Sequence, residues 1–192
     1  MKLLAISNKN MDEYVALLTD DGNTTQTRCL KSIAHKKGYF HATVHIWLFT
    51  SNGELLIQKR NPDKDAFPNL WDVSVAGHIE FEEKPIEAAL REASEEIGLE
   101  LQVASLKFIG SHREKHRHHS NFIDNELHHI YISELTQPLT SLKLQQEEVS
   151  KVKLIPLKKI QEKISKKDSR FVPHYKSYYD FVFKEIARII SK

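Results

Sequence analysis

The sequence predicts a mixed α/β domain in which helices are layered against a β-sheet. Three features predict this class: several short segments rich in β-branched and aromatic residues, an amphipathic helix in the middle of the chain, and another at its end. Strands on either side of a central helix favour a layered arrangement. A length of 192 residues fits one hydrophobic core, so we expect a single domain over residues 1–192.

The first half of the chain is predicted to consist mostly of strands. Tyr14–Leu18 reads as a short strand, followed by a turn at Asp20–Asn23. Leu30–Lys37 is a helix candidate because Gly38 supplies the left-handed residue that commonly ends a helix. We treat residues 1–40 as an N-terminal extension. Further strands are predicted at His41–Thr50, Leu55–Arg60 and Trp71–Ala76. A proline-containing loop over residues 61–70 is expected before the last of these strands.

The second half is organised around the helix predicted at Pro85–Ile97. Its apolar residues recur at helical spacing, a proline suits its first turn, and Gly98 ends it. The remaining strands are predicted at Leu101–Gly110, Asn121–Glu134 and Val149–Ile155. A polar loop rich in His and Arg is expected over residues 111–120, between the first two of them. Two further helices are predicted within residues 157–192, at Leu157–Ser165 and Pro173–Ile190.

Charge and composition exclude several classes of protein. Net charge is +2, but residues 151–192 carry +8 and the first 150 residues −6. Because the basic tail also holds many apolar residues, we expect a covering element of the same domain rather than a nucleic-acid-binding arm. A lone Cys29 excludes an internal disulfide framework. No apolar run approaches the roughly 20 residues that cross a bilayer, and Met1–Ser7 is too short for a secretory signal, so we expect a cytoplasmic protein.

Three glutamates mark one face of the central helix. Glu92, Glu95 and Glu96 stand at positions i, i+3 and i+4, which places them within an arc of about 100°. An exposed glutamate row is common, but here a loop containing Gly77 and Glu83 precedes it. Carboxylate oxygens are the ligands that a hard dication such as Mg²⁺ or Mn²⁺ prefers, together with the phosphate oxygens of a ligand.

The segment from Gly77 to Leu99 resembles the Nudix box in all its charged and glycine positions, which are Gly77, Glu83, Arg91, Glu92, Glu95, Glu96 and Gly98. The resemblance implies an α+β fold, an α/β/α sandwich with a mixed sheet and a C-terminal helix. It also implies divalent-metal-dependent cleavage of a diphosphate linkage in a small molecule. Glu92, Glu95 and Glu96 would be metal ligands, Gly77 would allow close backbone approach to the metal, and Arg91 would orient a glutamate.

Residues 35–155 are similar to the Nudix branch that contains isopentenyl-diphosphate isomerase. The stretch QKRNPDKDAFPNLWDVSVAGH resembles the diphosphate-binding loop of that branch, with Arg60 and Lys64 at the positions that hold the diphosphate. The resemblance further implies a second metal site, made of three histidines and two carboxylates: His35, His41, His78, Asp124 and Glu126.

One departure from the isomerase pattern decides between two activities. Ala76 stands where the isomerases have their catalytic cysteine, while the box keeps Glu92 and Glu95. We therefore expect a Nudix pyrophosphohydrolase acting on a nucleoside diphosphate derivative or a related diphosphate compound. An isopentenyl-diphosphate isomerase and a non-catalytic nucleotide-binding sensor are the alternatives.

The general base and the oligomeric state stay open at this point. Glu126 is the preferred base, Glu92 the alternative, and Glu147 or Glu148 the third choice. The histidine tract at residues 112–119, which His128 and His129 follow, is read as a solvated or phosphate-touching loop, with Zn²⁺ or Ni²⁺ binding as the alternative. We expect neither a membrane nor a nucleic acid as partner, and leave a monomer or a homodimer open.

Overall fold

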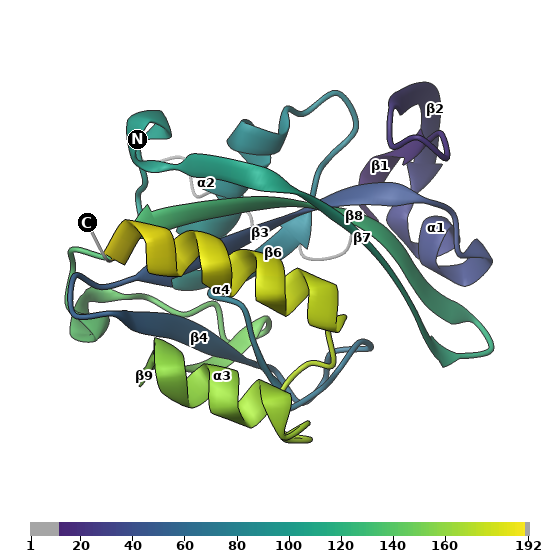
Figure 1. Ribbon diagram of the computed structural model, residues 1–192. Helices are drawn as coiled ribbons and strands as arrows, with labels where there is room; N and C mark the ends of the chain where they lie inside the picture. Colours follow the sequence, from purple (N-terminus) through teal and green to yellow (C-terminus); the bar gives the residue numbers. More distant parts are fainter. Residues whose placement is uncertain (1–11, 191–192) are drawn as a thin grey trace.

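The computed structural model describes residues 12–190, which contain one nine-stranded sheet with helices on both of its faces (Figure 1). The strands in chain order are β1 (Tyr14–Leu18), β2 (Thr24–Leu30), β3 (His41–Phe49), β4 (Glu54–Arg60), β5 (Trp71–Asp72), β6 (Val75–His78), β7 (Lys107–His119), β8 (Phe122–Glu134) and β9 (Val149–Pro156). The helices are α1 (Lys31–Lys37), α2 (Pro85–Ile97), α3 (Leu157–Ser165) and α4 (Lys176–Ile190), with short 3₁₀ turns η1 (Val103–Ser105) and η2 (Leu139–Ser141).

Strand β3 lies at the centre of a mixed sheet. It pairs antiparallel with β1, β4 and β6, and parallel with β8, from His41 opposite Glu126 to Phe49 opposite Glu134. β9 continues the sheet beside β4, and β7 continues it beside β8. Parallel strands need a long crossover connection, and here α2 lies within it. The mixed sheet predicted from the sequence is confirmed.

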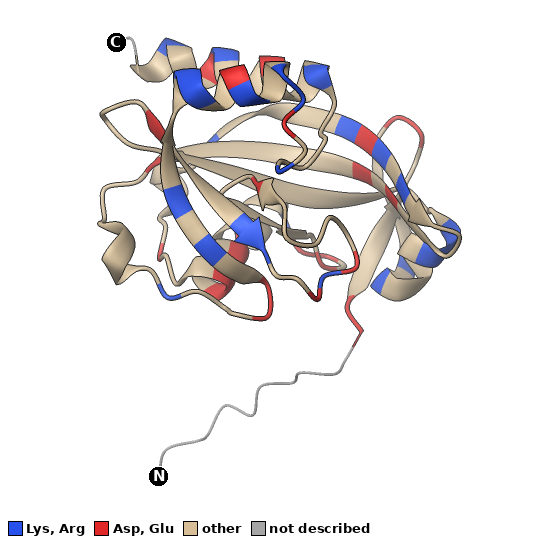
Figure 2. Cartoon of the chain, turned by 90° about the horizontal axis from the view of Figure 1, so that it is seen from below, with Lys and Arg blue, Asp and Glu red and all other residues tan. Residues whose placement is uncertain are grey.

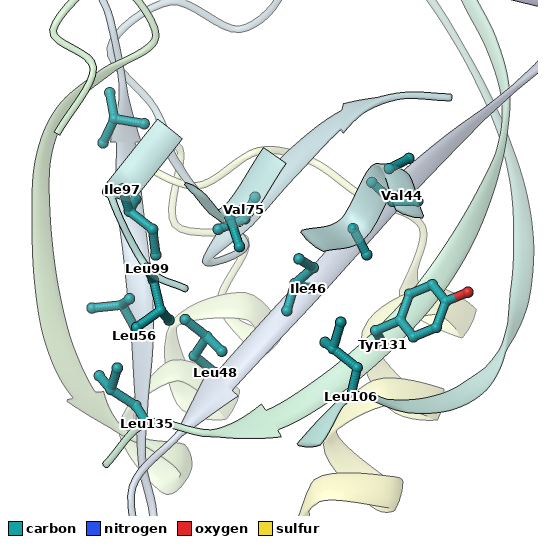
Figure 3. Close-up of a cluster of buried hydrophobic side chains, with 14 of the residues drawn as sticks. Val44, Ile46, Leu48, Leu56, Val75, Ile97, Leu99, Leu106, Tyr131 and Leu135 are labelled. Atoms are coloured by element: carbon teal, nitrogen blue, oxygen red, sulfur yellow. The ribbon is translucent and has the colours of Figure 1, made fainter. Parts of the chain in front are cut away.

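The side chains of β3 alternate between two hydrophobic cores. Val44, Ile46 and Leu48 pack on the face covered by α2, in one cluster with Ile97 of that helix (Figure 3). Trp47 points to the opposite face and packs under α4. All residues of β3 are buried, as expected for a central strand covered on both sides.

Helix α2 spans the predicted residues Pro85–Ile97. The Glu87 carboxylate accepts a hydrogen bond from the Lys84 N–H before the first turn, and Gly98 ends the helix in the left-handed region, at φ 65°. The buried face carries small residues that allow a close approach to the sheet, namely Ala88, Ala89 and Ala93. Glu92 and Glu96 lie beside this buried face and are thereby held against β6, where Glu96 accepts a hydrogen bond from the Ala76 N–H.

The basic C-terminal segment covers the second core. Helix α4 buries an aromatic and aliphatic stripe that includes Tyr178, Val182 and Phe183. Basic and acidic positions are intermixed along its exposed side (Figure 2). The segment is thus part of the fold, as the sequence predicts. In the described part of the chain, each helix is too short or too polar to span a bilayer.

Three predictions need correction, and one strand was not predicted. The segment at residues 111–119 is strand rather than loop, because β7 continues through it and pairs with β8 as far as His119 opposite Phe122. Thr24–Leu30 was not predicted, yet it forms β2 by pairing with β1. Trp71–Ala76 is divided into β5 and β6, and helix α4 begins three residues after Pro173. The segment Met1–Ser7 lies outside the described residues.

Candidate active site

A cavity of about 500 Å³ opens between α2, the ends of β3 and β6, the β7–β8 hairpin and the loop at residues 61–70. Most of the site residues predicted from the sequence line it. They are His35, Arg60, Lys64, Gly77, His78, Glu92, Glu95, Glu96, Asp124 and Glu126. Arg91 and His41 are not among the lining residues, but Arg91 donates a hydrogen bond to Glu92, and His41 lies 3.6 Å from Glu126.

Arg91 organises the carboxylates of the box. Its guanidinium donates two hydrogen bonds of 2.9 Å to the Glu83 carboxylate, and a third of 2.8 Å to Glu92 Oε1. It also donates to the His78 carbonyl oxygen at 2.9 Å and to Glu95 Oε2 at 3.2 Å. A planar guanidinium with five donors suits this bridging position. Arg91 therefore ties the box helix to the preceding loop and fixes the direction of the Glu92 side chain.

Glu96 and Glu92 are buried carboxylates. Glu96 is 4% exposed, and its Oε2 accepts hydrogen bonds from Gln58 Nε2 and from the Ala76 N–H. Burial raises the pKa of Glu96 well above its usual range, and Glu92 and Glu148 raise it further. Burial also raises the pKa of Glu92 to about 7, although Arg91 acts in the opposite direction. Two desolvated carboxylates facing one cavity have the chemistry of a divalent-cation site.

Gly77 is required for the position of Glu92. A Cβ atom added at Gly77 would lie 1.9 Å from the Glu92 Cδ atom, far inside van der Waals contact. Glu95, in contrast, is 54% exposed and bonds to Arg91. The three box glutamates line one cavity. In the part of the chain that the structure describes, however, their carboxylate oxygens do not all lie within 4.8 Å of one another.

We expect Mg²⁺ to stabilise the protein more at about pH 8 than at about pH 5. The folded-state pKa of Glu92 is raised, so its stabilising contribution in metal-free protein is complete below its ordinary pKa of 4.5 and is lost as pH rises through about 7. A shift of this size corresponds to about 3 kcal/mol. Mg²⁺ would compete with the proton and restore that loss.

Thermal unfolding with Mg²⁺ or with a chelator at both pH values measures this effect. In Glu92→Gln, the Mg²⁺-induced shift of Tm should differ less between the two pH values than it does in the parent protein. An equal Mg²⁺-induced shift of Tm at both pH values in the parent protein would contradict the expectation.

The predicted histidine and carboxylate residues also come together. One nitrogen each of His35, His41 and His78 and one oxygen of Glu126 lie within 4.8 Å of one another. Glu126 Oε1 is 3.5 Å from His78 Nε2 and 3.6 Å from His41 Nε2, and the latter atom is buried without a hydrogen-bond partner. Asp124 Oδ1 lies 3.0 Å from His35 Nδ1. Four of the five predicted residues thus converge, and Asp124 supports them from outside.

The electrostatics of this group match a cation site. Burial alone would raise the pKa of Glu126, but His41 and His78 hold it well below its usual range. Tyr39 O accepts a hydrogen bond from His41 Nδ1, which leaves the Nε2 lone pair directed at the group. His35 Nε2 and His78 Nε2 face each other at 3.0 Å. Imidazole nitrogens and a carboxylate at this spacing fit a dication of the Zn²⁺ or Mn²⁺ kind.

The two residues predicted to bind a diphosphate lie at the rim of the same cavity. Arg60 donates hydrogen bonds to Asp72 Oδ2 at 3.1 Å and to the Ala66 carbonyl oxygen at 2.9 Å. Lys64 forms an ion pair with Glu148. Ala76 lies on β6 beside Glu96, while Cys29 lies on β2 and does not line the cavity.

Sequence reasoning missed a second group of polar side chains in the cavity wall: Asp72, Glu114 and His174 were not singled out, and His128 was considered only together with the histidine-rich tract. For Glu114 a signal exists, because the burial of residues 112–118 alternates, with His and Glu inward and Arg and Lys outward. Such alternation predicts a strand. For His174, which follows β8 by a long stretch of chain, no local signal exists.

Comparison with known proteins identifies the family. The family model described as NUDIX domain matches residues 39–175. Nudix hydrolase 3 of Arabidopsis thaliana is 35% identical over 167 residues, which are 85% of this chain but 22% of that protein. An uncharacterized Nudix hydrolase of Clostridium acetobutylicum is 37% identical over 72% of this chain and 67% of its own length. The chain therefore belongs to the Nudix family. The predicted enzyme class, a Nudix-type pyrophosphohydrolase, is confirmed.

The likeness to the isomerase branch is confirmed as well. Isopentenyl-diphosphate delta-isomerase of Serratia proteamaculans is 32% identical over 122 residues, covering 64% of this chain and 66% of that protein. Among solved structures, the fold is similar to DR0079 of Deinococcus radiodurans, with a TM-score of 0.63, 21% identity, and coverage of 80% and 89% of the two chains. A MutT protein of Methanosarcina mazei gives a TM-score of 0.59 at 17% identity, covering 80% of this chain and 96% of its own.

Proposed function

We propose that this chain is a Mg²⁺- or Mn²⁺-dependent hydrolase that cleaves the phosphoanhydride bond of a nucleoside diphosphate derivative or a related diphosphate compound. One observation carries the proposal: the buried carboxylates of Glu92 and Glu96 share a cavity with the cationic side chains of Arg60 and Lys64. Diphosphate hydrolysis needs anionic side chains that bind a divalent cation and cationic side chains that bind phosphate oxygens, and this cavity would supply both.

Most side chains have one task in this proposal, and Glu92 would have two, as a metal ligand and as the general base. Glu92, Glu95 and Glu96 would hold the ion, which when bound would withdraw charge from the diphosphate oxygens and lower the pKa of the attacking water. Arg91 would keep Glu92 in place, as its hydrogen bonds suggest. Arg60 and Lys64 would bind the diphosphate.

The electrostatics favour Glu92 over Glu126 as the general base. A base works best when its pKa lies near the working pH, and the pKa of Glu92 is raised to about 7 by its burial. Glu126 was preferred from the sequence, but His41 and His78 hold its pKa low. That environment supports a role for Glu126 as a metal ligand. Glu148 forms an ion pair with Lys64, so we assign it to the positioning of that diphosphate-binding residue rather than to the role of base.

The Lys64→Gln variant is expected to raise KM by about tenfold while changing kcat less. Lys64 is half-buried at the rim, and its present partner Glu148 can be exchanged for a phosphate oxygen. Loss of one exposed charge contact of about 1.4 kcal/mol gives a factor of this size. Steady-state kinetics measure the change, with Lys158→Gln, on the exposed side of α3, as control. An unchanged KM would remove Lys64 from the binding site.

A product screen tests the activity itself. The purified chain, with Mg²⁺ or Mn²⁺, is incubated with nucleotide sugars, nucleoside di- and triphosphates, dinucleoside polyphosphates and prenyl diphosphates, and the products are separated by chromatography. We expect cleavage of at least one compound, and its loss in Glu96→Gln. If a nucleotide binds stoichiometrically and none of the compounds is cleaved, the chain is a sensor and the proposal is wrong.

The isomerase is the second candidate, favoured by the relatives of that name and by the converging histidines. It would interconvert isopentenyl and dimethylallyl diphosphate without releasing phosphate. The isomerase activity is disfavoured because Ala76 stands at the position of the catalytic cysteine in the isomerase pattern. Formation of dimethylallyl diphosphate with no free phosphate would establish it.

We further propose that the group of His35, His41, His78, Asp124 and Glu126 holds a second metal ion. Its convergent nitrogen and oxygen atoms support this. The single domain over residues 1–192, the cytoplasmic location and the choice between monomer and homodimer stay predictions.

A further inference from the structure

A second group of histidine and carboxylate side chains lies away from the box and adjoins the group around Glu126, since His128 Nδ1 is 3.7 Å from Glu126 Oε2. It consists of Glu114 on β7, His128 on β8 and His174 just before α4, with one ligand atom of each within 4.8 Å of the others. Glu114 is 1% exposed, and both histidines are almost as deeply buried. The two strands of one hairpin and a distant segment before α4 thus place polar atoms at one point of the cavity wall.

The distances at this point suit a tetrahedral metal centre. Glu114 Oε2 lies 3.5 Å from His128 Nε2 and 2.6 Å from His174 Nδ1. Two ligand atoms bound at about 2.1 Å to a tetrahedral ion lie roughly 3.4 Å apart. The first pair already has this spacing, and the second would have to open by roughly 0.8 Å. His116 Nε2, also 3.5 Å from Glu114 Oε2, is a buried nitrogen without a hydrogen-bond partner and stands ready as a further ligand.

The far side of each histidine is held in the manner of metal-binding histidines. His174 Nε2 lies 3.0 Å from Asp72 Oδ1, and Asp72 is in turn bound by Arg60 at 3.1 Å. His128 Nδ1 lies 2.7 Å from Thr43 Oγ1. The Asp72 carboxylate can only accept, so it fixes a proton on His174 Nε2, and the Thr43 hydroxyl can accept the Nδ1 proton of His128; each arrangement leaves the lone pair of the other ring nitrogen for a metal.

The other oxygen of Glu114 is also held. Oε1 accepts a hydrogen bond of 2.5 Å from the Tyr175 N–H, which leaves Oε2 facing the histidines. In the absence of an ion, His174 would be a cation shared by Asp72 and Glu114. That arrangement satisfies His174 but provides no hydrogen bond for His116 Nε2.

We propose that Glu114, His128 and His174 form a binding site for a transition-metal dication of the Zn²⁺ class, distinct from the Mg²⁺ site of the box. Two imidazole nitrogens and one carboxylate select such an ion over Mg²⁺, which prefers oxygen ligands and near-octahedral geometry. All three residues line the cavity, so the fourth tetrahedral position would be taken either by His116 or by a ligand in the cavity. The site does not depend on the proposed hydrolase activity.

Co²⁺ is the probe, because it replaces Zn²⁺ and its visible absorption reports the coordination geometry. Metal-stripped protein is dialysed against Co²⁺ in the presence of excess Mg²⁺, which keeps the box filled. Bound cobalt is then measured by mass spectrometry. Glu114→Gln and His128→Gln should each lose about one equivalent of Co²⁺ per chain and the matching absorption band. His41→Gln should lose a different equivalent, from the group around Glu126.

His129→Gln is the matched control. His129 neighbours His128 on the same strand but contacts Ser111 and Phe108 instead of this group, so its cobalt content should equal that of the parent. Circular dichroism establishes that each variant is folded, and Glu114→Gln keeps the shape of the side chain if His128→Gln fails to fold. Unchanged cobalt content and absorption in folded Glu114→Gln would overturn the proposal.

Discussion

The Glu96→Gln variant is expected to hydrolyse its substrate about 10³-fold more slowly than the parent, and to unfold at the same or a higher temperature. Loss of one buried carboxylate ligand removes several kcal/mol of charge stabilisation, and each 1.36 kcal/mol changes the rate tenfold. The amide oxygen can still accept the hydrogen bonds of Gln58 and Ala76. Because burial raises the pKa of Glu96, replacing it with a neutral group also removes a destabilising charge.

Rates under substrate saturation and thermal unfolding of the same preparation test both parts of this expectation. The control is Glu100→Gln, an exposed carboxylate just beyond the same helix that bonds to Ser94. Its activity should equal that of the parent. A Glu96→Gln protein that turns over at the parental rate would mean that the box helix has no part in the chemistry.

The Gly77→Ala variant is expected to lower kcat/KM by about 10²-fold. The new methyl group would occupy the place of the Glu92 carboxylate, 1.9 Å from its Cδ atom, and would push that side chain away from Arg91. A displacement of about 1 Å in a catalytic group has an effect of this order. Steady-state kinetics at saturating Mg²⁺ give the value.

A double-mutant cycle shows whether the effect passes through Glu92. If it does, adding Gly77→Ala to Glu92→Gln should lower activity much less than it does in the parent. Equal factors in both backgrounds would mean that Gly77 acts elsewhere, for example by general distortion of β6. Circular dichroism separates that outcome from loss of the fold.

The parts of the fold that could be predicted from the sequence are those specified by local pattern. Helix α2 has a periodic apolar face and an end signal in adjacent residues, so its limits came out correctly. β2 had no such pattern, because most of its side chains are exposed and its partner β1 determines it. The outer part of β7 was taken for a loop because its inward residues are His and Glu rather than apolar, since they face a polar cavity instead of a core.

The candidate site divides in the same way. The box residues lie on one helix and the loop before it, so their spacing in sequence translates directly into proximity in space. The group around Glu126 could be expected only through resemblance to a known family. The group of Glu114, His128 and His174 depends on the register of β7 against β8 and on the path of the chain before α4. Neither is written in the spacing of these residues.

The parallel pairing of β3 with β8 has a consequence for how the protein folds. Thr43 and His128, which meet across this ladder, are separated by 85 positions in the chain. Contacts of such long range require closure of a large loop before they return any stabilisation, and they slow folding. The cavity wall is therefore one of the last features to form during synthesis. Because α2 precedes β8 in the chain, all residues of the box helix have left the ribosome before the cavity can form.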